Sequence, residues 1–203
     1  MVNEQPTGNP TPSEDIGKAG ISVKEGVISS LKGINEIEAE IVSLVRSTVS
    51  NTLRATNIVG IEAVGVTKDV VMGAIQATEE VGTGLILSTK SVAKGVIMGV
   101  SDVGGDIVSV AGSTVKGAVK GAAEVGADVA MVARRSVDGV IEATKEVGGN
   151  VEEVAKVAVT GAIDAASTIS KTAVKAVRDM LVGVVEGVKD VADTAIPRSK
   201  KAA

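Results

Sequence analysis

The chain has 203 residues and contains no histidine, cysteine, tryptophan, tyrosine or phenylalanine. These missing side chains exclude an ordinary zinc, copper or haem site, a thiol nucleophile and aromatic stacking on single-stranded nucleic acid. The 21 basic and 25 acidic residues give a net charge of −4, whereas a nucleic-acid-binding protein would show a basic stripe. We therefore expect no enzyme, no metal or other cofactor, no nucleic-acid partner and no small-molecule substrate.

The first 22 residues are predicted to form a disordered polar arm. The opening segment, MVNEQPTGNPTPSEDIG, is rich in proline, glycine and threonine and offers few apolar side chains for a core. It has neither the basic start nor the apolar stretch of a secretory signal peptide. We expect the ordered part of the chain to begin at Val23.

Residues 23–198 form an array that repeats every eleven residues without an insertion or a deletion. Two of its units are TKDVVMGAIQA, which begins at Thr67, and TKEVGGNVEEV, which begins at Thr144. The second column of the unit is usually Lys or Arg and the third is often acidic. The fourth, eighth and ninth columns are mostly Val, Ile or Ala. Eleven residues complete three turns at 3.67 residues per turn, which is close to the α-helical period.

On a helix of this period, the apolar columns form a single arc of roughly 160°. The columns do not alternate with the period of two that a strand requires, although Val and Thr make a strand-rich state a hazard under other conditions. We therefore predict an all-α fold without an aromatic core, either one long amphipathic helix or helical hairpins built from 11- and 22-residue repeats. A continuous helix would be roughly 260 Å long. Breaks at Gly104-Gly105 or Gly148-Gly149 would instead give hairpins.

The glycines of the array fall into two series that each step by 22 residues. The fifth-column series should lie inside the apolar arc, and the seventh-column series should lie on the polar side. Each glycine in a helix costs about 1 kcal/mol relative to alanine, so together they cost about 10 kcal/mol, which is comparable to the stability of a whole domain. The helix should therefore need a surface to lie on, or close helix–helix contacts at the glycines. The candidate helix-packing glycines are Gly60, Gly82, Gly104, Gly126 and Gly148 in the fifth column and Gly73, Gly95, Gly117, Gly139, Gly161 and Gly183 in the seventh.

The cations of the second column should lie at one edge of the apolar arc. Long basic side chains in that position can extend to lipid headgroups while their stems remain on the apolar surface. The candidate headgroup contacts are Lys68, Lys90, Arg134, Lys145, Lys156, Arg178 and Lys189.

The chain is expected to end in a short basic tail at residues 199–203, after Pro197. Charged residues interrupt every apolar run well before the roughly 20 residues that a membrane span needs. We therefore expect a cytoplasmic protein without a signal peptide or transmembrane span, peripheral to a membrane or granule.

Three segments of the array resemble the repeat of the synucleins and, at the level of periodicity, the perilipin-type lipid-droplet proteins. They are VKEGV at residues 23–27, TKDVV at residues 67–71 and TKEVGG at residues 144–149. The resemblance implies a monomer that is unfolded in solution and becomes helical on lipid. The chain departs from the synuclein pattern because it has no acidic tail, no aromatic residue and a balanced set of charges.

The sequence therefore favours a non-catalytic repeat protein that coats a lipid or other hydrophobic surface, such as a membrane, a lipid droplet or a polymer granule. The main alternative is a self-assembling structural protein in which Gly, Ala and Val pack helix on helix to form a bundle, tube or filament. A third hypothesis is a stress protectant that resembles the late-embryogenesis proteins. We expect a homo-oligomer whose partner is a lipid or hydrophobic surface.

Overall fold

The computed structural model describes residues 33, 35–55, 63–81 and 84–195. It divides the chain into two compact units, Met1–Ile37 and Glu38–Ala203. In the first unit the described residues, 33 and 35–37, are helical. The predicted arm at 1–22 and the predicted tail at 199–203 lie outside the described residues, as do Gly60 and Gly82.

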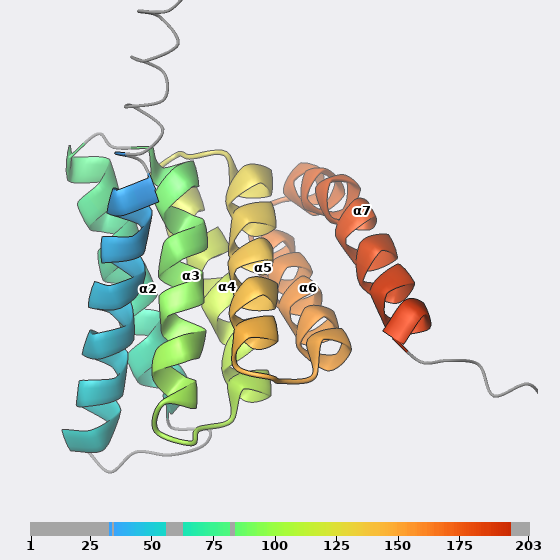
Figure 1. The fold of residues 1–203 in the computed structure, drawn as a ribbon. Helices are drawn as coiled ribbons and strands as arrows, with labels where there is room; N and C mark the ends of the chain where they lie inside the picture. The colour runs from blue at the N-terminus through green and yellow to red at the C-terminus, as the bar shows by residue number, and fades with distance from the viewer. Residues whose placement is uncertain (1–32, 34, 56–62, 82–83, 196–203) are drawn as a thin grey trace, which may run out of the picture. The chain divides into compact units, whose positions relative to one another are not determined.

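The described part of the second unit consists of helices and the turns between them, and none of it is a strand. This confirms the predicted all-α class. In the second unit, residues 38–55 form a helix, and six labelled helices follow (Figure 1). These are α2 (Ala63–Val81), α3 (Leu85–Ser101), α4 (Ile107–Glu124), α5 (Val129–Glu146), α6 (Val151–Ser167) and α7 (Lys171–Ala195).

The array is not one continuous helix, because a glycine with positive φ ends three of the helices. Gly126 follows α4 with a φ of 71°, a conformation that glycine adopts without a steric penalty. The backbone N–H groups of Gly126 and Ala127 donate to the carbonyls of Ala123 and Ala122, at 3.3 and 2.8 Å. This pair of bonds is a Schellman motif, which satisfies the carbonyls at the end of a helix. Equivalent glycines follow α3 and α5 at Gly104 and Gly148.

Two residues after each of these glycines, a polar side chain starts the next helix. The carboxylate of Asp128 accepts hydrogen bonds from the backbone N–H groups of Ala130 and Met131, at 3.0 and 3.1 Å. Asp106 caps α4 in the same manner, and the side chain of Asn150 accepts a hydrogen bond from the backbone N–H of Glu153 at the start of α6. Such a cap satisfies donors that have no partner within the helix. The segments VGGD, VGAD and VGGN at 103–106, 125–128 and 147–150 thus each end one helix and begin another, at steps of 22 residues.

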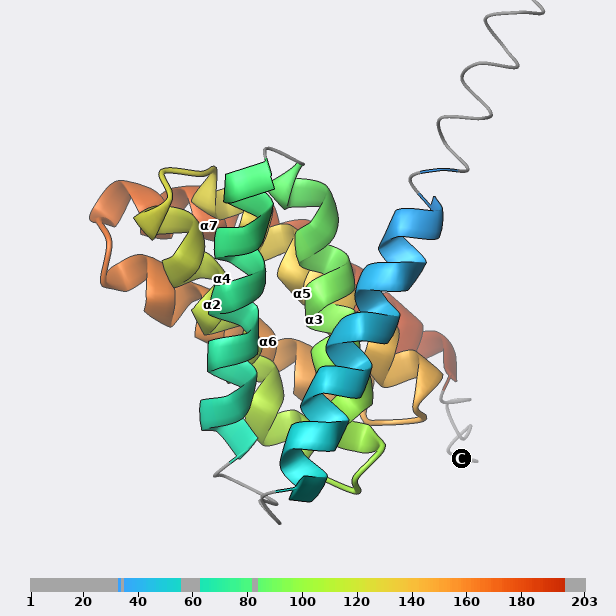
Figure 2. The same ribbon diagram turned by 90° about the vertical axis from the view of Figure 1, so that its left-hand side faces the viewer.

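The helices of the second unit form two layers. The helix at 38–55, α3 and α5 form one layer, and α2, α4 and α6 form the other (Figures 1 and 2). The most extensive contacts join helices that are two positions apart in the chain, α3 with α5 and α4 with α6. The last helix, α7, packs on both α5 and α6. Among the labelled helices, contacts join only those that lie one or two positions apart in the chain.

The core between the layers is built mainly from valine and alanine. Val96, Val115, Val137 and Ala158 are fully buried examples, one from each of α3 to α6. The larger side chains in the core are Leu53, Ile75, Ile97, Ile141 and Leu181. Because small side chains have a short reach, a core of this composition stays free of voids only if the helices approach each other closely.

The turn geometry predicts that Gly126→Ala lowers the free energy of unfolding by about 1–2 kcal/mol, because an L-residue is strained at positive φ. Gly183→Ala, in α7, is the matched control. A Cβ at that position meets nothing within 4 Å, so this variant should be as stable as the parent or up to about 1 kcal/mol more stable. Urea unfolding followed by circular dichroism measures both. A Gly126→Ala variant with undiminished stability would contradict the role of this glycine in the turn.

Candidate functional site

Three glycines of the seventh column lie in close contact with a neighbouring helix. Gly139 of α5 lies against the backbone carbonyl of Lys90 in α3, and a Cβ on this glycine would overlap the carbonyl oxygen. Gly161 of α6 lies in the same manner against the carbonyl of Gly112 in α4. In both pairs the partner is 49 residues earlier in the chain. These glycines therefore allow the backbones of two helices in one layer to come into direct contact.

Gly95 of α3 forms the corresponding contact with the helix at 38–55. A Cβ on Gly95 would lie 2.8 Å from Cβ of Val45 and 2.9 Å from the carbonyl oxygen of Val42. Contacts this short are essentially absent between real side chains, so an added methyl would push the two helices apart. Glycine contacts of this kind therefore occur in both layers.

The other seventh-column glycines do not share this role. A Cβ on Gly117 would make an ordinary contact, 3.7 Å from Cγ1 of Val71, and a Cβ on Gly73 or Gly183 would meet nothing within 4 Å. Near Gly183, the Arg134 guanidinium reaches across from α5 to the Met180 carbonyl at 3.4 Å. At this point α5 and α7 are joined by a side chain and a backbone carbonyl. Gly73 and Gly183 therefore form no close helix contact among the described residues of this chain, and the helix-packing role predicted for them stays a prediction.

The fifth-column glycines that are described lie outside the helix–helix contacts of this chain. Gly104, Gly126 and Gly148 lie in turns and have open space where a Cβ would be. The eleven-residue wheel placed them inside an apolar arc because it assumed that the helix continued through them. Their positive φ angles end the helix instead.

Further contact glycines were missed in the sequence, and Gly112 of α4 is one of them, since a Cβ on it would be 2.9 Å from Cγ1 of Val157 in α6. Gly99 lies on the same face of α3 as Gly95, and a Cβ on it would be 2.7 Å from the Arg46 carbonyl oxygen. Gly121 of α4 lies under Ile75, whose Cδ1 would be 2.9 Å from an added Cβ. The signal for Gly99 and Gly121 was the Gly-x-x-x-Gly spacing of GVIMG at 95–99 and GAVKG at 117–121, which brings two glycines onto one face of a helix.

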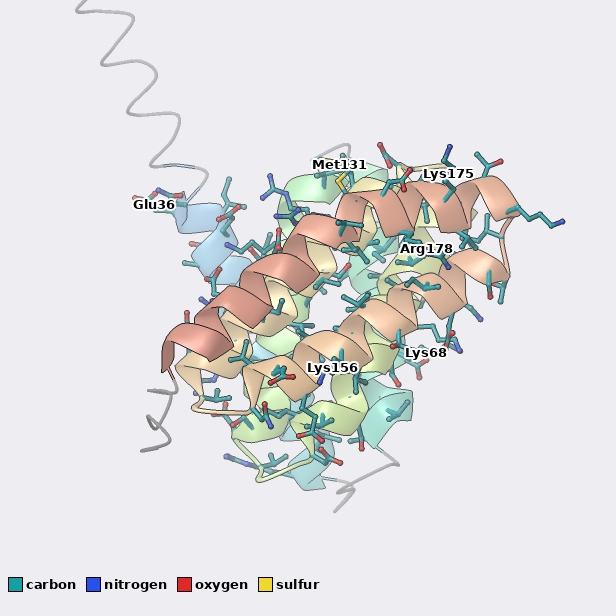
Figure 3. All side chains as sticks on the ribbon, turned by 90° about the vertical axis from the view of Figure 1, so that its right-hand side faces the viewer. Glu36, Lys68, Met131, Lys156, Lys175 and Arg178 are labelled. Carbon is teal, nitrogen blue, oxygen red and sulfur yellow. The ribbon has the colours of Figure 1, made fainter. Side chains whose placement is uncertain are left out.

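The candidate headgroup cations are distributed over several helices, and Figure 3 shows three of them on separate helices. Lys90 pairs with Glu142 at 2.5 Å, Arg134 with Asp138 at 3.1 Å, and Lys156 with Glu152 at 2.7 Å. The exposed cations of this set are Lys68 on α2, Lys145 at the end of α5 and Arg178 on α7. The structure does not describe the side chain of Lys189. Because the chain folds back at each turn, these cations do not line one edge of one helix. Their contact with headgroups stays a prediction.

An ion-pair network crosses the outer surface between α3 and α5. The ammonium of Lys94 lies 2.8 Å from a carboxylate oxygen of Glu142 and 2.6 Å from one of Glu146. Burial acts to raise the pKa of Glu142, but hydrogen bonds from Lys90 and Lys94 outweigh it, and the pKa is lowered. A second pair joins the helix at 38–55 to the turn after α3, where Arg46 binds both carboxylate oxygens of Asp102 at 2.6 and 2.7 Å. That hydrogen bonding lowers the pKa of Asp102.

Neither a metal-binding cluster nor a membrane-spanning helix is found among the described residues. They contain no group of three or more acidic, histidine or cysteine side chains that could hold a metal ion. None of the helices searched among them has the length and apolar character to cross a membrane. A comparison with protein-family models finds no match, and a comparison with curated proteins finds no match either. The features that remain for function are the glycine contacts and the charged surfaces.

The glycine contacts predict a graded response to added methyl groups. Gly139→Ala and Gly161→Ala should each lower the free energy of unfolding by about 1–3 kcal/mol, because a backbone carbonyl lies where the methyl would be. Gly117→Ala has room for its methyl and should be neutral or up to about 1 kcal/mol more stable. Urea unfolding of the three variants measures the difference. Equal stabilities for Gly117→Ala and Gly139→Ala would contradict the close helix contact.

The paired carboxylates predict a loss of stability in acid. The lowered pKa values of Asp102 and Glu142 mean that the unfolded chain takes up protons first as the pH falls. Their contribution is complete above the ordinary pKa values of about 4 and is lost as the pH falls through the lower folded values. The urea midpoint should therefore drop between pH 6 and pH 3.

The urea midpoint of the Glu142→Gln variant should fall less between pH 6 and pH 3 than that of the parent, because the variant lacks one of the titrating groups. Glu124→Gln is the control, since Glu124 is exposed at the end of α4 and forms no ion pair among the described residues. An acid response that is identical in the parent and in Glu142→Gln would count against the network.

Proposed function

We propose that this chain is a non-catalytic structural protein whose helices bury their apolar faces on one another and which assembles with further copies of itself. The observation that carries the proposal is the direct contact of Gly139 and Gly161 with backbone carbonyls of neighbouring helices. A helix that lay alone on a fluid surface would gain nothing from such glycines and would bear their cost in helix propensity. Between packed helices, the same glycines allow the short side chains of the core to meet.

The burial pattern supports the proposal. A helix that lies on lipid needs its apolar face free to enter the interface. Here the apolar positions of α3 to α6 are largely taken up by the core between the layers. In the described part of the second unit, the large hydrophobic side chains that remain exposed are Leu44, Ile169 and Val182. The folded surface thus offers little apolar area to a membrane.

Assembly is supported by the open-ended arrangement of the helices. In solenoid repeat proteins each unit contacts only its near neighbours, and the terminal units keep a face that interior units bury. Within the described residues, α2 has open space over Gly73, and α7 exposes 49% of Val182 and has open space over Gly183. The two faces belong to different helices, so a contact between them would be head-to-tail and would generate a ring or a filament.

Coating of a lipid surface is the second candidate function, and the composition of the core favours it. A buried alanine stabilises the fold little, because its side chain is a single methyl group and each buried CH₂ group contributes only about 0.8 kcal/mol. A bundle with a core of valine and alanine would need little energy to open, and the opened helices would present continuous apolar arcs to lipid. The resemblance to the synuclein repeat implies the same behaviour.

Circular dichroism and light scattering at two protein concentrations, each with and without vesicles, separate the two candidates. We expect the dilute chain to be helical without vesicles and its mass to rise with concentration. A chain that is unfolded when dilute and gains helix only on vesicles would overturn the structural proposal in favour of the lipid coat.

A surface variant tests assembly apart from folding. Val182→Glu adds a charge to the exposed face of α7 and should lower the mass at high concentration while the helix content stays the same. Lys145→Gln changes the net charge by the same amount at the end of α5 and should leave the mass unchanged. If Val182→Glu assembles as the parent does, this face of α7 does not take part in the contact.

A further inference from the structure

A groove between α2 and α4 gathers three lysines. Its volume is about 320 Å³, and it is lined by Val64, Lys68, Ser113, Lys116, Gly117 and Lys120. Lys116 and Lys120 are four residues apart and therefore lie on one face of α4. The stem of Lys68 crosses from α2 toward the same place, since its Cγ would be 3.9 Å from a Cβ on Gly117. Glycine at 117 thus leaves room between the three side chains.

The charge in this groove is not balanced by the described residues. None of the lining residues is acidic, and neither Lys68, Lys116 nor Lys120 forms an ion pair among the described residues. In the other layer the lysines of α3 are paired with carboxylates of α5. Lys90 pairs with Glu142, and Lys94 pairs with Glu142 and with Glu146. Three ammonium groups around one groove repel one another unless an anion lies between them.

The neighbouring groove differs in this respect. It lies between α4 and α6, has a volume of about 350 Å³ and shares Lys116 with the first groove. It also contains the carboxylate of Asp164, and its second cation, Lys156, is paired with Glu152. The lining of the groove between α2 and α4 thus contains no acidic residue, whereas the lining of the neighbouring groove contains Asp164.

We infer that the groove between α2 and α4 binds a phosphate group. Lysine binds phosphate as a point charge, and the hydroxyl of Ser113 can donate a hydrogen bond to a phosphate oxygen. A phosphate that carries two charges offsets the repulsion among the three ammonium groups better than a monovalent anion does. The phosphate group can belong to a free polyphosphate or to a lipid headgroup, and both present the same chemistry to the groove. This site is independent of the assembly proposed above.

Isothermal titration with inorganic tripolyphosphate at low ionic strength tests the site. We expect the parent chain to bind it and the affinity to fall as salt is added. The double variant Lys116→Gln/Lys120→Gln should bind about a hundredfold more weakly, because it loses two charged hydrogen bonds that are each worth about a factor of ten. Its circular dichroism spectrum should match that of the parent, since both side chains extend from the outer face of α4.

A matched control removes the same charge elsewhere. Lys145→Gln/Lys175→Gln neutralises two exposed lysines on α5 and α7 and should keep the affinity of the parent. Equal losses in the two double variants would overturn the site, because binding would then follow net charge alone. Absence of binding by the parent to both tripolyphosphate and vesicles that contain phosphatidic acid would overturn it as well.

Vesicles distinguish the two sources of phosphate. Sedimentation with phosphatidylcholine vesicles that contain phosphatidic acid, and loss of this sedimentation in Lys116→Gln/Lys120→Gln, would assign the site to a lipid headgroup. Binding of tripolyphosphate without sedimentation would assign it to a free phosphate. Failure of the assembly experiments affects neither result, because the groove lies between two helices of one chain.

Discussion

The short reach of valine and alanine side chains is the constraint on which the rest of this structure depends. Helices that carry such side chains fill the space between them only when their backbones come close. Glycine permits that approach at Gly139 and Gly161, where a carbonyl of the neighbouring helix occupies the volume of a side chain. The packing therefore offsets the cost of these glycines in helix propensity. Their positions in the sequence are set by the points at which the helices cross.

The helical class could be predicted from the sequence, because an eleven-residue period fits the α-helix. Breaks at two Gly-Gly pairs were one of two alternatives, because glycine pairs weaken a helix but do not exclude a continuous one. The break at Gly126 was not anticipated, since alanine follows it and its conformation depends on the cap at Asp128. A helical wheel assumes a continuous helix, so it assigned the turn glycines to an apolar face. The structure identifies each turn by a glycine with positive φ and a capping Asp or Asn two residues later.

The candidate sites show the same limit. Gly95, Gly139 and Gly161 belonged to the predicted glycine series, but nothing in the series set them apart from Gly73 or Gly183, where a Cβ would meet no described atom within 4 Å. Lys116 and Lys120 occupy different columns of the repeat from Lys68, so periodicity alone did not join them. They come together because α2 packs on α4, and the pairing of helices two positions apart is a property of the fold that no local pattern encodes.

The 22-residue spacing of the turns also has a consequence for how such a chain can change in length. An added block of eleven residues would keep the apolar face in phase but would displace the next turn into the middle of a helix. A block of 22 residues adds one helix with its own turn, and contacts that reach only two helices along the chain confine the disturbance to the insertion point. Each helix reverses the direction of the chain. Whether the array has an odd or an even number of helices therefore decides at which end of the helices the chain leaves it. Duplication in pairs would lengthen the array and keep the exit at the same end.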